Sequence, residues 1–266
     1  MSGALPPELI ARARDRAERS SATQPTAPSA AGRPGADTRP WATYALLGTL
    51  AVAFAGQTAL LGTLGPSAAA LYRIGGMQAE ALRAGGWERL FVAALLHGGL
   101  AHWLMNSYAL WSIAPFVERF LGRGWLFVVF TVGALSGGLL GALFHGPSVV
   151  SLGASGGITG LFAAGLLLTL PFPAMARAAA TGKLASLRGG LVRALLFAFL
   201  PLLMKNSGID GFAHLGGAIG GACVALPLLL RREAPKQAGN ALAALCAIAF
   251  VAALVKVALY TDFSAP

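Results

Sequence analysis

Residues 210–221 read Asp-Gly-Phe-Ala-His-Leu-Gly-Gly-Ala-Ile-Gly-Gly and open an apolar segment that continues to residue 230. A helix needs about 20 apolar residues to cross a bilayer, so this segment is long enough to span one. Ala213, Gly217 and Gly221 recur every four residues and form a smooth helix face on which a second helix can pack closely. His214 lies beside that face, and polar side chains at membrane depth are rare and costly. The stretch therefore predicts a bundle of tightly packed membrane helices.

The composition of the whole chain agrees with this prediction. Of the 266 residues, 56% are hydrophobic and only 11% are charged, whereas soluble domains carry about 25% charged residues. A net charge of +10 can indicate a nucleic-acid partner. Here, however, the basic residues lie between apolar segments and do not gather with aromatic residues in one patch. We therefore expect the chain to be embedded in a lipid bilayer and to bind no nucleic acid.

Seven segments are candidate membrane spans, which predicts an all-α polytopic membrane protein. Two of them are irregular: residues 90–117 contain several polar side chains, and residues 188–204 are short and contain Pro201. The other five are uniformly apolar and comprise residues 43–64, 124–144, 150–170, 211–230 and 239–260.

The positions of Lys and Arg predict the orientation, because basic residues are enriched in cytoplasmic loops. With the N-terminus inside, most of the 20 basic residues fall in inside segments, and seven spans then place the C-terminus outside. Residues 1–40 lack the apolar core of a signal peptide and are expected to form a flexible cytoplasmic tail. The composition, rich in Ala, Gly and Arg, is typical of bacteria, so we expect the bacterial inner membrane.

Residues 153–157, Gly-Ala-Ser-Gly-Gly, lie at the start of the fourth span. In the predicted orientation Ser155 lies near the outer surface, at the N-terminus of its helix. Unpaired N–H groups and the positive end of the helix dipole are found there and suit an oxyanion. The same small residues would also serve helix packing alone, so this motif by itself does not decide between an active site and a helix interface.

Ser155 and His214 are expected at the same depth, since each lies near the outer end of a span that runs from outside to inside. A serine hydroxyl is a weak nucleophile that needs a base, and histidine has the pKa range for that role. His102 and Asn106 share one helix face and offer N–H donors to an oxyanion. We interpret Ser155 as nucleophile and His214 as base. In the alternative, His102 and Asn106 would only join helices by hydrogen bonds.

Other protease chemistries lack their residues in this sequence. The chain has no His-Glu-x-x-His zinc motif and no pair of membrane-embedded aspartates, so no metal or other cofactor is expected. Asp210 lies four residues before His214 and is expected to cap that helix. His145 ends the third span and is expected in an interfacial loop rather than as the base.

Taken in this order, the motifs resemble the rhomboid family of intramembrane serine proteases over about residues 41–230. The resemblance implies a six-helix core with a short central Ser155 helix, followed in residues 231–266 by a loop and a seventh helix. It also implies a Ser155–His214 dyad and single-span membrane proteins as substrates, cut near the outer side of the bilayer. The motifs are Trp87-x-Arg89, His97-x4-His102-x3-Asn106, Gly153-x-Ser155-Gly156 and Asp210-x2-Ala213-His214.

The same resemblance implies the surroundings of the dyad. The oxyanion hole would comprise His102, Asn106 and the backbone N–H of Ser155. Residues 65–98 would form a half-embedded loop, so that the second span starts near Gly99. Residues 188–204 and the loop 205–209 would act as a lateral gate. The sequence departs from the family pattern in two places. Glu88 is inserted between Trp87 and Arg89, which are usually adjacent, and Thr159 stands where an aromatic residue often stacks against the histidine.

Two other functions are compatible with a polytopic chain of this kind. A rhomboid-like pseudoprotease would bind membrane clients without cutting them, but such proteins typically lack the serine or the histidine, and this chain has both. A transporter that uses His102, Asn106 and His214 as a proton relay would show a repeat between its two halves, and the sequence shows none. An active intramembrane protease is therefore the favoured prediction.

Overall fold

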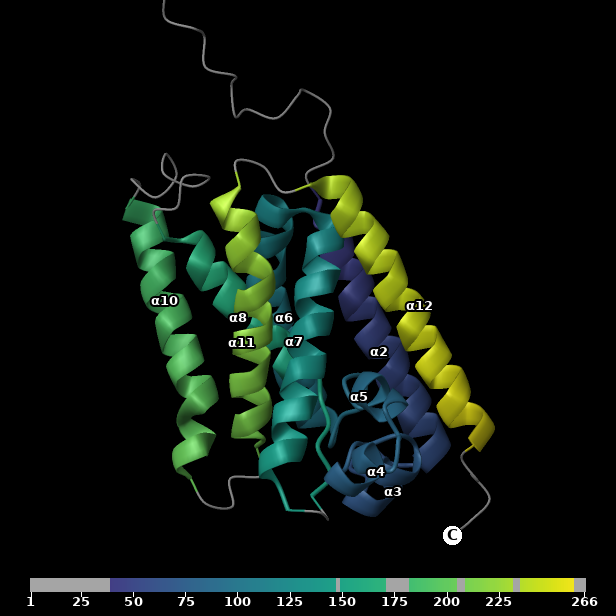
Figure 1. Cartoon of the computed structure of the whole chain (residues 1–266). Helices are drawn as coiled ribbons and strands as arrows, with labels where there is room; N and C mark the ends of the chain where they lie inside the picture. Colours follow the sequence, from purple (N-terminus) through teal and green to yellow (C-terminus); the bar gives the residue numbers. More distant parts are fainter. Residues whose placement is uncertain (1–38, 147–148, 171–181, 205–208, 232–234, 261–266) are drawn as a thin grey trace, which may run out of the picture. The chain divides into compact units, whose positions relative to one another are not determined.

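The computed structural model describes residues 39–146, 149–170, 182–204, 209–231 and 235–260, which form α-helices and short turns (Figure 1). In these residues the only β-pairing is an isolated antiparallel bridge between Met77 and Ser151, so the predicted all-α class is confirmed. Of the tail expected over residues 1–40, residues 1–38 lie outside the described part of the chain. The same holds for residues 205–208 of the loop 205–209. The long helices are α2 (Trp41–Leu61), α6 (Leu100–Leu121), α7 (Arg123–Phe144), α8 (Ser155–Leu168), α10 (Gly182–Phe199), α11 (Gly211–Leu230) and α12 (Lys236–Tyr260).

Five of these helices are long and apolar enough to cross a membrane, namely α2, α7, α10 with the turn that follows it, α11 and α12. Helix α8 is apolar but has only 14 residues. Helix α6 has 22 residues and carries several polar side chains. The two helices that depart from a regular span are thus the ones that contain Ser155 and the pair His102 and Asn106.

Helix α6 begins later than the span that the apolar segment 90–117 predicted. It starts at Leu100, because Gly98 and Gly99 interrupt the helix and Gly99 has a φ of 150°, a conformation that favours glycine. A Cβ at Gly99 would also lie only 3.2 Å from the carbonyl oxygen of Leu64. This result corrects the predicted start of the second span and agrees with the start near Gly99 that the family resemblance implied.

The chain between α2 and α6 folds into three short helices, α3 (Ala68–Arg73), α4 (Ala79–Arg83) and α5 (Glu88–Val92). The orientation predicted from the sequence places this segment on the outer side, and it is called the outer segment below. Arg89 joins its parts. Its Nη1 donates hydrogen bonds to the carbonyl oxygens of Tyr72 and Gly76 at 2.6 and 2.8 Å, and its guanidinium lies 4.3 Å from the centroid of the Tyr72 ring. The arginine of the Trp87-x-Arg89 motif therefore has a structural role here.

Helices α8 and α11 pack with their backbones nearly in contact. A Cβ added at Gly217 would lie 2.1 Å from the carbonyl oxygen of Gly156, and one added at Gly221 would lie 2.3 Å from that of Gly160. The face of α11 that contains Ala213 therefore lies directly against α8, as its four-residue spacing predicted. Helix α8 also packs against α6, α7 and α10, so it occupies the centre of the bundle (Figure 1).

The last helix, α12, packs against α7 and α5. Its Lys256 Nζ lies 2.7 Å from Oε2 of Glu88 and 5.1 Å from the centroid of the Trp87 ring. On the same helix, Val257 and Ala253 are buried against Leu71 and other apolar side chains of the outer segment. Helix α12 is thus attached to that segment by both an ion pair and an apolar contact.

Candidate active site

Ser155 is the first residue of α8, and the outer segment holds the chain just before it. Met77 and Ser151 exchange two backbone hydrogen bonds with N···O distances of 3.1 and 2.8 Å. Two residues further on, the N–H of Gly153 donates to the carbonyl oxygen of Ala93 at 2.8 Å. These backbone contacts fix where Ser155 enters its helix.

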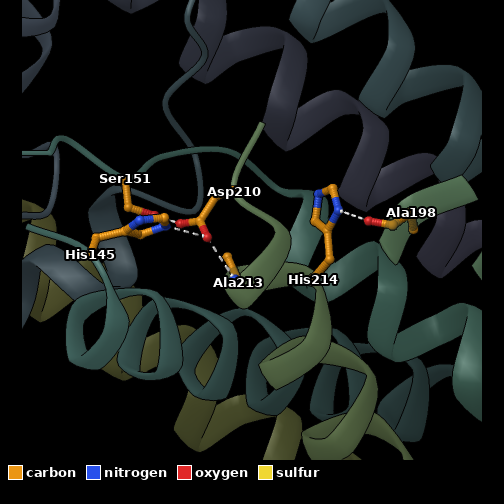
Figure 2. Close-up of polar contacts among 6 residues, drawn as sticks. All are labelled: His145, Ser151, Ala198, Asp210, Ala213 and His214. Atoms are coloured by element: carbon orange, nitrogen blue, oxygen red, sulfur yellow. Dashed lines mark hydrogen bonds and ion pairs between the residues drawn. The ribbon is translucent and has the colours of Figure 1, made fainter. Parts of the chain in front are cut away.

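His214 is the fourth residue of α11 and its surface is 8% exposed. Its Nδ1 lies 2.7 Å from the carbonyl oxygen of Ala198 in α10, as Figure 2 shows. A carbonyl oxygen can only accept, so Nδ1 carries the hydrogen of this bond. The Nε2 of a neutral ring is then the basic nitrogen, and that is the tautomer in which a histidine can take a proton from serine.

Thr159 contacts α11 at the level of this histidine. Its hydroxyl oxygen lies 3.1 Å from the carbonyl oxygen of His214, and 3.0 and 2.9 Å from those of Ser155 and Gly156. The single hydroxyl hydrogen can serve one of these acceptors at a time. Thr159, which replaces the aromatic residue of the family pattern, therefore contacts the backbone of His214, while the ring is oriented from α10.

Ser155 and His214 lie on helices in direct contact, near the N-terminus of each. Within the described residues, no hydrogen bond joins the Ser155 hydroxyl to the His214 ring. Catalytic hydrogen bonds are often long in the absence of substrate and tighten in the reacting complex. The helix positions predicted from the sequence are thus found, and the pairing of the two side chains is left as a proposal.

His102 and Asn106 both point at Gly153, two residues before Ser155. A Cβ added at Gly153 would lie 3.0 Å from Nε2 of His102 and 3.8 Å from Nδ2 of Asn106. The N–H of Gly98 donates to Nδ1 of His102 at 3.2 Å, so the hydrogen of a neutral ring lies on Nε2. The amide of Asn106 donates to the carbonyl oxygen of His102 at 3.1 Å and has a second hydrogen. Two N–H donors thus face the same place, as an oxyanion hole requires.

Asp210 caps α11, as the sequence predicted, since its Oδ1 accepts the N–H of Ala213 at 2.8 Å. The same carboxylate lies 2.7 Å from Nε2 of His145 and 2.5 Å from the hydroxyl of Ser151 (Figure 2). Sequence reasoning did not predict this cluster. In it the Ser151 hydroxyl and the His145 ring each bond to a different oxygen of the carboxylate. His145 follows the last residue of α7 and faces Asp210, and its place outside the dyad stays a prediction.

A cavity of about 20 Å³ adjoins Ser155 and is lined by Gly153, Ala213 and Met77, among others. A volume of this size accommodates one water molecule. In the part of the chain that the structure describes, no group of three or more His, Cys, Asp or Glu residues is arranged to hold a metal ion.

Comparison with known proteins places this arrangement in a family. The family model for the Rhomboid domain matches residues 84–231, which is more than half of the chain and includes all four candidate site residues. The chain belongs to the rhomboid family. With five helices suited to cross a membrane, this rhomboid protein is a multi-pass integral membrane protein.

Several rhomboid relatives are similar over the same region. The putative rhomboid protease YdcA of Bacillus subtilis is 31% identical over 150 residues, which cover 56% of this chain and 71% of YdcA. Rhomboid protease GluP of the same organism is 30% identical over 160 residues, covering 59% of this chain and 29% of GluP. RHOMBOID-like protein 4 of Arabidopsis thaliana is 33% identical over 170 residues, covering 63% of this chain and 41% of that protein. The match therefore spans less than half the length of two of these three relatives.

Proposed function

We propose that this rhomboid protein is an intramembrane serine endopeptidase that uses Ser155 as nucleophile and His214 as general base. The observation that carries the proposal is the hydrogen bond from His214 Nδ1 to the Ala198 carbonyl oxygen. It leaves Nε2 as the basic nitrogen, on a helix whose backbone touches the first turn of the Ser155 helix. A serine and a base in adjacent first turns are the parts that acyl transfer needs.

In the proposed reaction the Ser155 oxygen attacks the carbonyl carbon of the scissile peptide while its proton passes to Nε2 of His214. The tetrahedral oxyanion is stabilised by the Nε2–H of His102, an amide hydrogen of Asn106 and the backbone N–H of Ser155. The intermediate collapses when His214 returns the proton to the leaving nitrogen, which releases one product and forms an acyl-enzyme. A water molecule then gives a proton to His214 and attacks the acyl carbon. His214 returns that proton to the Ser155 oxygen as its bond to the acyl carbon breaks, which frees the second product as a carboxylic acid and restores both residues.

The proposed substrates are single-span membrane proteins, cut near the outer side of the bilayer. The position of Ser155 at the outer end of its helix supports this site, given the orientation that the basic residues favour, with the N-terminus in the cytoplasm. We further propose the bacterial inner membrane as its location. Helix α10 would act as the lateral gate, a role supported by how little of it is buried: 11% of the span Ser186–Leu203, against 56% for α7 and α11.

The test is cleavage of a single-span substrate by the full chain reconstituted in liposomes. The Ser155→Ala and His214→Ala variants are expected to lose cleavage, and Ser155→Ala is expected to lose labelling by a fluorophosphonate probe. Ser112→Ala is the matched control, because the Ser112 hydroxyl lies on an exposed face of α6 and bonds only within its own helix. Cleavage at the wild-type rate by either dyad variant would refute the proposal. Binding of the substrate without cleavage by the wild type would favour a pseudoprotease.

A further inference from the structure

Helix α10 provides a backbone acceptor to the candidate base, and the reason lies in how this helix ends. The α-helix stops at Phe199 and continues as a 3-10 turn, Leu200–Leu203. In 3-10 geometry the carbonyl of Ala198 would accept from the residue three positions on. That residue is Pro201, which has no N–H. The carbonyl of Ala198 thus lacks this donor and accepts the Nδ1–H of His214 instead.

Contacts along α10 hold this carbonyl in place. At the inner end, the Arg188 side chain donates to the hydroxyl and the carbonyl oxygen of Thr169, at the C-terminus of α8. In the middle, Leu195 is buried in a cluster with Ala163 of α8 and Ala218 of α11. Helix α10 therefore rests on both of the helices that carry the dyad, and the bond to His214 lies in its last turn.

We propose that α10 is the third partner of the Ser155–His214 pair, with the carbonyl of Ala198 as the group that positions the base. The inference rests on the proposed function and adds to it. In serine proteases with a triad, the histidine is held in its working tautomer by an acceptor at Nδ1, usually a carboxylate. No carboxylate reaches His214 among the described residues, since Asp210 is engaged with Ala213, His145 and Ser151. The backbone of α10 fills that place.

One consequence is that the base is competent only while α10 is docked. Among the residues of α10 whose side chains are described, only Leu191 and Leu195 are buried, whereas Val192, Leu196 and Phe197 are exposed, so the helix is held through one face. If α10 moves away at the level of Ala198, the Nδ1–H loses its acceptor. The tautomer of a neutral histidine depends on the hydrogen bond made by its other nitrogen, and a ring with its hydrogen on Nε2 cannot accept the proton of Ser155.

The first test measures the tautomer directly by ¹⁵N NMR of the full-length protein labelled at histidine. The His214 signal is assigned because it is absent from the spectrum of His214→Gln. At a pH where the ring is neutral, the expected signal has Nδ1 protonated and Nε2 unprotonated, in wild type and in Ser155→Ala alike. A ring with hydrogen on Nε2, or an even mixture of tautomers, would overturn the proposal. Because this measurement needs no catalysis, it stands even if Ser155 proves not to be the nucleophile.

The second test changes the end of α10. Pro201→Ala supplies an N–H that competes for the Ala198 carbonyl, so part of the His214 population should change tautomer. Loss of the histidine orienter in a triad costs about 10⁴-fold in kcat, and for a neutral carbonyl we expect a fall of about 10-fold to 100-fold in labelling rate and kcat, with KM unchanged. Val52→Ala, on α2 outside the proposed gate and 74% exposed, should retain the wild-type tautomer and rate. A Pro201→Ala protein with wild-type tautomer and rate contradicts the proposal.

Discussion

Gly153 lies so close to His102 that a Cβ on this glycine would come within 2.9 Å of ring atom Cε1 and 3.0 Å of Nε2. Its φ of 115° is also unfavourable for any other residue. Gly153 is thus the residue that leaves room between the two proposed oxyanion donors and the entry to the Ser155 helix.

The first prediction follows from this relationship. Gly153→Ala should place a methyl group where the oxyanion would lie and should lower kcat at least about 100-fold, the typical effect of losing one oxyanion donor. The check is the rate of substrate cleavage in liposomes, measured with the rate of fluorophosphonate labelling. Gly146→Ala is the control, because a Cβ there meets no atom within 4 Å. Equal rates for both variants would place the oxyanion elsewhere.

A second prediction concerns Asn106, whose side chain is nearly buried. Asn106→Ala removes one proposed donor and leaves the other, His102, in place. We expect kcat to fall by about 10²-fold to 10³-fold with little change in KM, because the donor acts mainly on the charge that develops in the transition state. A larger KM with normal kcat would indicate that Asn106 binds substrate instead, and a normal value of both would leave it only its hydrogen bond within α6.

The carboxylate of Asp210 carries the third prediction. Asp210→Ala removes the cap of α11 and the acceptor of Ser151 and His145. Loss of an N-cap alone costs about 1 kcal/mol of stability, so the melting temperature should fall clearly. Labelling of Ser155 should slow as well, because Asp210 joins the chain before Ser155 to the helix of His214. Asp210→Asn, which keeps a side-chain oxygen for the cap, should lie between alanine and wild type. A lower melting temperature with unchanged labelling would limit Asp210 to a stabilising role.

Much of this arrangement can be predicted from the sequence because its signals are local. The four-residue spacing of Ala213, Gly217 and Gly221 predicts the close contact with α8, since a small-residue face allows it in any membrane bundle. The spacing of His102 and Asn106 predicts their common face, and both do face Gly153. These predictions need only helix geometry and the cost of polar groups in lipid.

The remaining features depend on tertiary contacts that no local sequence pattern predicts. The acceptor for His214 is a backbone carbonyl, which every residue has, and only Pro201 hints that the one at Ala198 is free. Ser151 and Asp210 are 59 positions apart, and their pairing depends on how three helix ends meet. The start of α6 was placed too early because residues before Gly98 are apolar enough for a span, although they belong to the outer segment.

The ion pair between Glu88 and Lys256 supports a final prediction, on the role of α12. Burial raises the pKa of Glu88, but the hydrogen bond and the charge of Lys256 outweigh it and hold the pKa below its ordinary value of 4.5. A carboxyl group with a lowered folded pKa stabilises the fold fully above its ordinary pKa, and that stabilisation disappears as pH falls through the lowered value. The wild type should therefore melt at a higher temperature than Glu88→Gln at pH 7, and the difference should shrink on acidification below 4.5 and vanish once the pH is below the lowered pKa. In the double variant with Lys256→Met, removal of Glu88 should have a smaller effect at pH 7 than in the wild type, as expected for residues in contact. Equal effects of Glu88→Gln with and without Lys256 would mean that α12 is attached to the outer segment by its apolar contacts alone.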